Sequence, residues 1–492
     1  SLGACGKEEN RADTLYVAAI NKGYGLNWLY GLLDAYCAKN EGMSYEVTPV
    51  VDDTQIKTKV ESGAAYCNYD LIFTGSQEPA GAEYLADLSD VYSYTYTDGT
   101  RVGISIGDSM ESSVYKAMTA RTDGLANKLM PWTSAVSGLM INEKVVSGAF
   151  GASWAETYQL RTTNELLAFC EALSAKNIPA FIHAAETNQY GGMYNTWFAQ
   201  YNGVQGVADF YSGIYYDELG RKKIGSEVTL NEGTLESAKV MESIFGGGYS
   251  YSGSNSLEWD VTQTYFMLGY SAMFSSGEWF KGEMSNQFPD VEIHMYKFPV
   301  ISSLATKYGI SEEQLLTLID YVDAVNDGQS AEKPSIETAD YTTDELIAIV
   351  KEARSWANSS ADYNTVAIPS YSSKLDKAKD FLKFMCSDEG QEIYVEKSNG
   401  LTMCYNYDLK NYSGYNTLST FAKDRWDIVK DVTFYFRDRT TKFGYAGLKP
   451  FAILSEAPIG VLMSRSKDRK SAQDVYDYDY NYYKDIWNTY VI

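Results

Sequence analysis

Several residue types that support common enzyme chemistry are scarce in this sequence. Only two histidines occur, His183 and His294, and they lie far apart, so no paired-histidine metal motif is present. The six cysteines form no CxxC pair, which excludes a zinc ribbon and a dithiol redox site. No apolar run reaches the about 18 residues that a membrane-spanning helix needs. We therefore expect no metal, no cofactor, no catalytic residues and no spanning helix.

Positive charge is scarce as well, whereas tyrosine is abundant. Lys and Arg number 41 against 65 Asp and Glu, for a net charge of −24, so nucleic acid is not an expected partner. The 42 tyrosines outnumber the 19 phenylalanines, and tyrosine rings pack on their faces while hydrogen-bonding at their edges. With 492 residues and 45% hydrophobic content, the chain can form about three domains or two large α/β lobes.

The first residues resemble a lipidation signal. Leu2-Gly3-Ala4-Cys5 places small residues before a cysteine, and the polar run 6–10 follows it. We expect Cys5 to carry a lipid and residues 1–13 to form a tether. The apolar segment that normally precedes such a cysteine is missing, so we interpret the chain as the trimmed end of an exported precursor.

Residues 14–73 alternate strand and helix patterns. Apolar, β-branched runs predict strands at 14–20, 45–51 and 69–73, and residues 29–37 and 54–62 have helical spacing. This order predicts a doubly wound parallel sheet, in which ligands bind at the carboxyl ends of the strands. The ends fall at 21–25 and 74–77, so the ligand contacts expected there are Tyr24, Gly25, Trp28, Ser76 and Gln77.

A second α/β pattern begins after Pro131. Strands are predicted at 137–142, 179–184, 270–274 and 291–298, and Thr162-x-x-Glu165 predicts the start of a helix. The polar segment 302–358, with helices at 312–324 and 343–356, is interpreted as an insertion. The tyrosine-rich segment 476–490 is expected to be a helix that docks on the second lobe.

Three local motifs imitate functional sites, and each has a better structural explanation. The turn 23–28 imitates a dinucleotide fingerprint, but Trp28 replaces its third glycine. Residues 103–107 match G-x-S-x-G, yet the alternation over 102–106 predicts a plain strand rather than a nucleophile elbow. Residues 323–328 resemble a calcium loop, but Val325 stands where an oxygen ligand belongs.

Four aromatic residues are candidates for stacking on a sugar ring. A pyranose has an apolar face and a belt of hydroxyls, so its site needs a flat ring with polar side chains around it. Trp279 follows a predicted strand end beside Glu278, which favours a binding role for both. Trp132 could serve the site or the core. The helical spacing around Trp197 favours the core, and Tyr190, in a glycine turn, is the better candidate.

Several segments together resemble the extracellular solute-binding lipoproteins of carbohydrate ABC importers, the class that includes maltose-binding protein. The segments that carry the resemblance are 22–25, 69–76, 138–144, 268–279 and 367–385. The resemblance implies two α/β lobes joined by three hinge crossovers near 133–137, 294–299 and 398–404, with the ligand in the cleft. The third crossover places Asn399 at the site. Lobe 1 would comprise 14–134 and 298–399, including an insertion at 302–358, and lobe 2 would comprise 135–297 and 400–492.

The function implied is that of a receptor rather than an enzyme. We expect a lipid-anchored monomer on the outer face of the cytoplasmic membrane, attached to the membrane only through Cys5, that delivers a carbohydrate to the permease subunits of an ABC importer. The negative charge and the aromatic residues favour a neutral oligosaccharide. The alternatives are an exported glycan-active enzyme and a sensory or adhesive glycan-binding lipoprotein.

Overall fold

The chain folds into two units, each assembled from separate stretches of sequence. The structure is a computed structural model that describes residues 11–184, 190–452, 454, 459–462 and 469–491. Unit 1 comprises Ser1–Ala135 with Ser359–Trp426, and unit 2 comprises Val136–Asn358 with Asp427–Ile492. The predicted lipidation residue Cys5 lies outside the described residues.

Unit 1 contains a five-stranded sheet in the order β2-β1-β3-β11-β4. β1 (Thr14–Ile20) pairs parallel with β2 (Ser44–Val50) and with β3 (Leu71–Phe73), as predicted. β11 (Thr365–Ala367) runs antiparallel to both β3 and β4 (Met130–Pro131). Every residue of β1 is buried, because helices cover both faces of the central strands.

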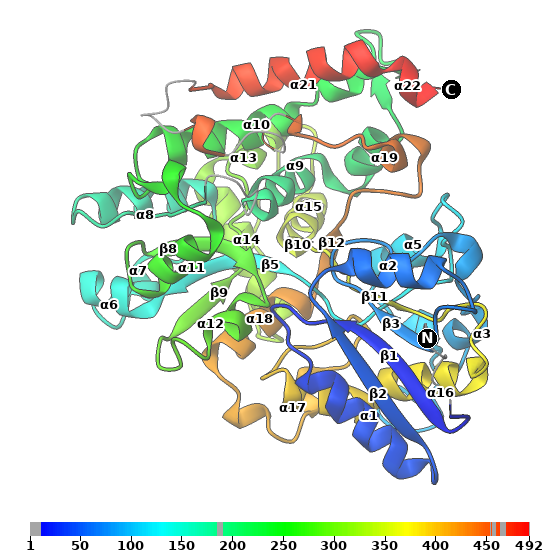
Figure 1. Cartoon of the computed structure of the whole chain (residues 1–492). Coiled ribbons are helices and arrows are strands. Elements are labelled where there is room, and N and C mark those ends of the chain that lie inside the picture. The colour runs from blue at the N-terminus through cyan, green and yellow to red at the C-terminus, as the bar shows by residue number, and fades with distance from the viewer. Residues whose placement is uncertain (1–10, 185–189, 453, 455–458, 463–468, 492) are drawn as a thin grey trace. The chain divides into compact units, whose positions relative to one another are not determined.

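Helices α1 (Asn27–Lys39) and α2 (Asp53–Glu61) connect the three parallel strands. The first crossover runs from β1 to β2, and the second runs back in the opposite direction from β2 past β1 to β3. Right-handed connections therefore place the two helices on opposite faces of the sheet (Figure 1). The remaining helices of unit 1 are α3 (Ser89–Tyr92), α4 (Ile106–Ser109), α5 (Ser112–Thr119), α16 (Leu375–Cys386) and α17 (Asp388–Lys397).

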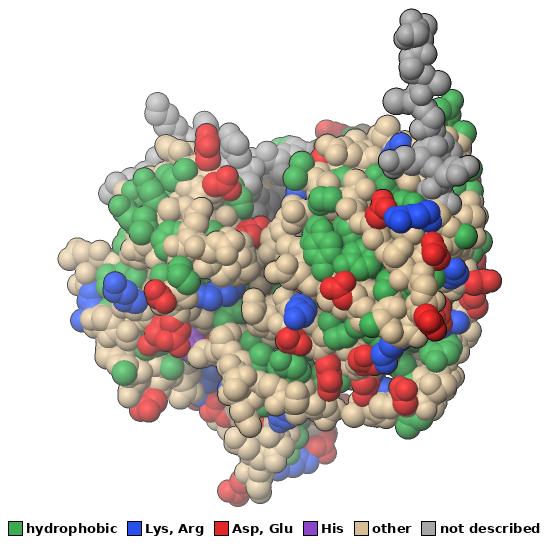
Figure 2. Space-filling model, turned by 60° about the horizontal axis from the view of Figure 1, so that its bottom comes forward, with side chains coloured by type: hydrophobic (Ala, Val, Ile, Leu, Met, Phe, Trp, Pro, Cys, Tyr) green, Lys and Arg blue, Asp and Glu red, His purple; other side chains and the backbone are tan. Residues whose placement is uncertain are grey.

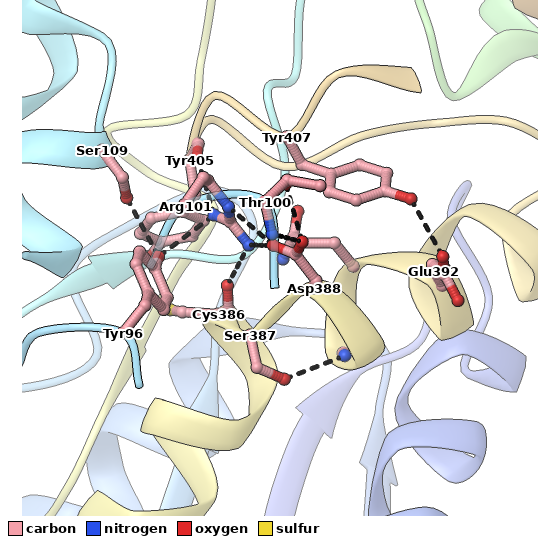
Figure 3. A network of polar contacts seen from close by, with 12 residues as sticks. Tyr96, Thr100, Arg101, Ser109, Cys386, Ser387, Asp388, Glu392, Tyr405 and Tyr407 are labelled. Carbon is pink, nitrogen blue, oxygen red and sulfur yellow. Dashed lines mark hydrogen bonds and ion pairs between the residues drawn. The ribbon is translucent and has the colours of Figure 1, made fainter. Parts of the chain in front are cut away.

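A buried arginine joins the later segment of unit 1 to the earlier one (Figure 3). Arg101 donates to the carbonyl oxygens of Tyr405 and Cys386, both at 2.8 Å, and forms an ion pair with Asp388 at 2.8 Å. Burial raises the pKa of Asp388, but hydrogen bonds from Thr100 and Arg101 outweigh it and hold the pKa below its ordinary value. This network ties residues 400–426 to unit 1.

Unit 2 is built around a three-stranded antiparallel sheet, β8-β5-β9, and a long helix. β5 (Ser137–Asn142) pairs antiparallel with β8 (Met273–Gly277) and with β9 (Ile293–Tyr296). Helix α9 (Gly191–Tyr211) packs against this sheet and is interrupted at Gly203, where φ is +70°. Trp197 on α9 is fully buried and donates from Nε1 to the Pro299 carbonyl at 3.0 Å, which confirms its predicted core role.

Short helices and two small strand pairs complete unit 2. The remaining strands are β6 (Ile214–Tyr216) with β7 (Lys222–Ile224), and β10 (Trp356–Asn358) with β12 (Thr433–Tyr435). The helices are α6 (Glu143–Phe150), α7 (Trp154–Thr157), α8 (Thr163–Ser174), α10 (Glu232–Met241), α11 (Trp259–Met267), α12 (Phe280–Met284), α13 (Ser303–Tyr308), α14 (Glu312–Asn326), α15 (Thr343–Ser355), α19 (Lys442–Ala446), α21 (Ala472–Ile486) and α22 (Asn488–Val491).

The division into units differs from the expected boundaries in two segments. The chain passes between units at 135/136, as expected, but then at 358/359 and at 426/427, where α18 (Thr420–Val429) spans the boundary. Residues 298–358 therefore belong to unit 2. Leu315, Leu318 and Ile319 of α14 are fully buried in its core, so this segment is not an insertion in the first lobe.

Two predicted strands also differ from the structure. Residues 179–184 form only isolated bridges at Phe181, although hydrogen bonds join this backbone to both 249–251 and 272–273. The predicted strand 102–106 is a turn followed by α4. Ser105 caps α4, accepting from the Asp108 backbone N–H at 3.0 Å, so the G-x-S-x-G segment is a helix start.

The predicted C-terminal helix is α21, which packs against α10 in unit 2. Its buried face includes Val475 and Tyr483, with Asp479 accepting hydrogen bonds from two backbone N–H groups, Phe451 and Ala452, both at 2.5 Å. Val475, Asp479 and Tyr483 recur every four residues and therefore lie on one buried face of α21.

The surface mixes charges of both signs. Figure 2 shows acidic and basic side chains interspersed on one face, with groups of hydrophobic side chains between them. Within the described ranges, no helix is long and apolar enough to cross a membrane, and no cluster of three or more metal-ligating side chains occurs. Asp323 of the suspected calcium loop pairs with Arg354 at 2.8 Å instead.

Candidate functional site at the strand ends

The carboxyl ends of β1 and β3 lie at one edge of the unit 1 sheet, because the two strands are parallel neighbours. We call this edge, with the loops 21–25 and 74–77 that leave it, the carboxyl edge. The first loop closes with a hydrogen bond from the Gly25 N–H to the Lys22 carbonyl at 2.7 Å. Gly25 has φ of +60°, a conformation that glycine adopts without strain.

Three of the predicted aromatic residues meet beside this loop. Trp28 and Trp132 stack with ring centroids 4.8 Å apart and planes 8° apart. Tyr24 meets Trp132 edge-on at 5.1 Å. Phe73 and Tyr394 pack edge-on against Trp28, both at 5.5 Å. The sequence prediction therefore identified residues that the fold brings together.

The two tryptophans are not exposed, however. Trp28 and Trp132 are each 1% exposed, whereas Tyr24 is half-buried. We predicted Trp28 as a ligand contact and Trp132 as a residue of either the site or the core. The structure places both in the core of unit 1, where they support the Tyr24 ring. The difference arises because Tyr394 covers Trp28 from a helix about 370 residues later in the chain, in the second stretch of unit 1.

The second loop presents polar side chains. Ser76 is exposed and Gln77 is half-exposed. Trp132 Nε1 donates to the Thr74 carbonyl at 2.9 Å, and Gln77 Nε2 donates to Thr54 Oγ1 at 3.2 Å. The loop is thus attached both to the tryptophan stack and to the start of α2.

Sequence reasoning missed two residues of the carboxyl edge, Asp53 and Asn364. Asp53 is fully buried and accepts hydrogen bonds from Gly75 and Ser76. Asn364 is 5% exposed, and its carbonyl accepts from the Trp132 backbone N–H at 3.1 Å. Asp53 could have been identified, because it follows β2, whose carboxyl end lies at the same edge. Asn364 precedes an antiparallel strand that the sequence pattern does not reveal.

Asn399 lies elsewhere in unit 1. It is exposed in the turn after α17, with φ of +59°. Helix α17 carries Tyr394 to the tryptophan stack, so Asn399 lies just beyond the helix that closes this cluster. Its predicted ligand contact stays a prediction.

In unit 2, Tyr190 lies in the core rather than on an exposed turn. Its side chain is fully buried, its hydroxyl donates to the Ile182 carbonyl, and its ring packs edge-on against Phe181 and Phe245. Burial raises the pKa of Tyr190 well above its ordinary value. The glycine turn that favoured exposure is instead the start of the buried helix α9.

Glu278 and Trp279 follow β8, as predicted. Glu278 is 1% exposed, so its predicted role as a ligand contact was wrong, and its backbone N–H donates to the Val136 carbonyl at 2.9 Å. Trp279 is half-buried. Its ring lies against Gly277, since a Cβ added there would stand 2.1 Å from two ring carbons. Gly277 thus allows the indole to lie flat over the end of the strand.

These arrangements suit binding more than catalysis. The carboxyl edge combines a half-buried tyrosine ring with serine and glutamine side chains, and within unit 2 a half-buried tryptophan follows β8. Such a ring with neutral hydrogen-bonding groups matches the apolar face and hydroxyl belt of a sugar.

The sequence matches the bacterial extracellular solute-binding proteins over residues 31–415. The chain belongs to this family. The match covers most of the chain, and a family that binds solutes outside the cell confirms the expectation of an exported binding protein rather than an enzyme. None of the curated proteins matches the sequence significantly.

Solved structures of other binding proteins have a fold similar to that of this solute-binding protein. A family 1 extracellular solute-binding protein from Bifidobacterium longum subsp. infantis aligns with a TM-score of 0.57 at 15% identity, covering 97% of this chain and 99% of that one. The cyclic α-maltosyl-1,6-maltose binding protein from Arthrobacter globiformis gives 0.58 at 14% identity, with the same coverage. Maltose-bound T. maritima MalE3 gives 0.56 at 12% identity, covering 96% and 99%. These likenesses confirm the predicted two-lobed α/β fold class.

Proposed function

We propose that this protein captures a neutral oligosaccharide and delivers it to the permease subunits of an ABC importer. The observation that carries the proposal is the carboxyl edge of unit 1. The half-buried Tyr24 ring packs there against Trp132, whose indole N–H donates to the Thr74 carbonyl at the start of the loop that carries Ser76 and Gln77. The half-buried indole of Trp279 supplies a second ring in unit 2.

The family and the charge support a neutral sugar. Structurally similar proteins are described as binding chitin oligosaccharide, cyclic α-maltosyl-1,6-maltose and maltose. The net charge of −24 disfavours anionic solutes, because like charges repel at distances up to the Debye length. We propose further that the protein acts as a monomer, anchored outside the cytoplasmic membrane through a lipid on Cys5.

A thermal-shift screen tests the ligand class. Neutral oligosaccharides of glucose, N-acetylglucosamine and xylose should raise the unfolding midpoint, because a ligand that binds only the folded state stabilises it by mass action. Acidic glycans should give little shift. Stabilisation only by peptides or charged small molecules would contradict the proposal.

A transport assay tests delivery. Cells that lack this protein should lose uptake of the labelled oligosaccharide identified by the screen, and should regain it when the gene is restored. Uptake that is unaffected by its loss would favour a sensory or adhesive role.

A further inference from the structure

Asp53 is a buried carboxylate whose contacts all serve the second loop of the carboxyl edge. Its Oδ2 accepts three hydrogen bonds: from the Gly75 N–H at 2.9 Å, the Ser76 N–H at 2.7 Å and the Ser76 hydroxyl at 2.9 Å. We infer that Asp53 is a positioning residue for ligand binding, which fixes the Gly75–Gln77 loop so that Ser76 and Gln77 present their side chains to the solute.

The position of Asp53 in the fold explains this role. Asp53 is the first residue of α2, which begins at the carboxyl end of β2, two strands away from β3 in the sheet. A negative charge in the first turn of a helix is favoured by the helix dipole. The neighbouring Asp52 provides the N-cap, accepting from the Thr54 N–H at 2.9 Å, so Asp53 is not needed for capping. Its carboxylate is therefore available to the loop.

The loop has little freedom once Asp53 holds it. A Cβ at Gly75 would lie 3.3 Å from both Asn364 Oδ1 and an Ile20 methyl group, so the backbone runs close to its neighbours. Thr74 is attached to Trp132 before this point, and Gln77 to Thr54 after it. Asp53 provides the contacts between these two attachments, where the exposed Ser76 is displayed.

One oxygen of the carboxylate has no donor. Asp53 Oδ1 is buried, and no hydrogen-bond partner for it occurs in the described part of the chain. A buried polar atom without a partner costs free energy, so Asp53 is a costly way to stabilise the fold alone. This cost favours a role in organising the loop for binding.

Another aspartate offers a matched control. Asp388 is also the first residue of a helix, α17, and its Oδ2 also accepts the backbone N–H and the hydroxyl of one residue, Thr100, at 2.5 and 2.6 Å. Thr100 is not among the residues predicted to contact the ligand. Substituting Asp388 thus removes the same kind of anchor, together with its ion pair with Arg101, from a loop that lies outside the candidate site.

The inference about Asp53 rests on the proposed function, and the experiment distinguishes a failure of the inference from a failure of the proposed function. Maltotriose, chitotriose and xylotriose are titrated separately into the wild-type protein, and the tightest binder is used for the variants. If none binds the wild type, the proposed function fails. If one binds, Asp53→Ala should weaken its affinity about tenfold, or ~1.4 kcal/mol, whereas Asp388→Asn should leave it within twofold.

Amide hydrogen exchange provides a readout that stability alone does not determine. In Asp53→Ala, the Gly75 and Ser76 amides should exchange at least tenfold faster than in Asp388→Asn compared at equal stability. Asp53→Asn retains one acceptor and should be intermediate in both measurements. Should Asp53→Ala fail to fold, Asp53→Asn and Ser76→Ala carry the test. Unchanged affinity in the folded Asp53 variants, or equal losses in Asp388→Asn, would overturn the inference.

Discussion

Replacing Trp279 by alanine should weaken ligand binding more than it weakens the fold. Truncating a fully buried tryptophan costs about 3–5 kcal/mol of stability. Trp279 is only half-buried, with its ring lying over Gly277, so we expect a loss of about 1–2 kcal/mol. Losing a stacking ring should cost about 1–3 kcal/mol of binding, by analogy with aromatic stacking on bases. That corresponds to about tenfold or more in affinity.

Trp197→Ala is the matched control in the same unit. Trp197 is fully buried and donates to the Pro299 carbonyl. Its truncation should therefore lower the free energy of unfolding by about 3–5 kcal/mol. Denaturant unfolding and calorimetric titration of both variants give the comparison. Trp279→Ala should show a small midpoint change with lost affinity. A midpoint as low as that of Trp197→Ala, or an unchanged affinity, would refute the binding role of Trp279.

Gly277→Ala tests the orientation of the same ring. The added methyl would stand 2.1 Å from two indole carbons, so the ring must rotate away from the strand end. We expect this variant to reproduce most of the affinity loss of Trp279→Ala although the indole is still present. Normal affinity in Gly277→Ala would show that the observed ring position is not the one used in binding.

Three further predictions concern stability. Burial lowers the pKa of His183 to about 4, below the ~6.5 of an unfolded chain. The free energy of unfolding should therefore rise with pH between these two values. Urea unfolding of His183→Gln should show a smaller rise. Burial raises the pKa of Asp388, but hydrogen bonds from Thr100 hold it below its ordinary value. The ionised carboxylate therefore stabilises the fold above pH ~4. Asp388→Asn should be less stable than the wild type at pH 7, and this difference in unfolding free energy should shrink as the pH falls below ~4. Trp132→Phe removes the donor to the Thr74 carbonyl and should cost about 1–3 kcal/mol; an unchanged denaturation midpoint would contradict this.

The parallel half of unit 1 could be predicted closely from the sequence. Apolar, β-branched runs locate β1, β2 and β3 within about two residues. β1 and β3 are buried throughout, which favours apolar side chains, whereas β2 lies at the sheet edge and is buried only at Val50. The strand predicted at 102–106 was wrong for a local reason. Gly103 adopts φ of +84° and Ser105 caps a helix, and a five-residue alternation cannot distinguish these features from a strand.

Unit membership was less predictable than the elements themselves. Helices α14 and α15 were predicted nearly at their observed bounds. Helical spacing identifies the buried face of α14, but not the surface that it packs against, so residues 302–358 were assigned to the wrong unit. The same limit applies to Trp28 and Trp132. A tryptophan near a strand end can be exposed or covered, and here Tyr394, distant in sequence, covers Trp28.

Calorimetric titration of the wild-type protein with neutral oligosaccharides, with chromatography of the recovered sugar, tests the central claim most directly. The account predicts saturable binding of about one ligand per chain and a recovered sugar of unchanged length. Shortened sugar products after many turnovers, or no binding heat with any neutral oligosaccharide, would contradict it.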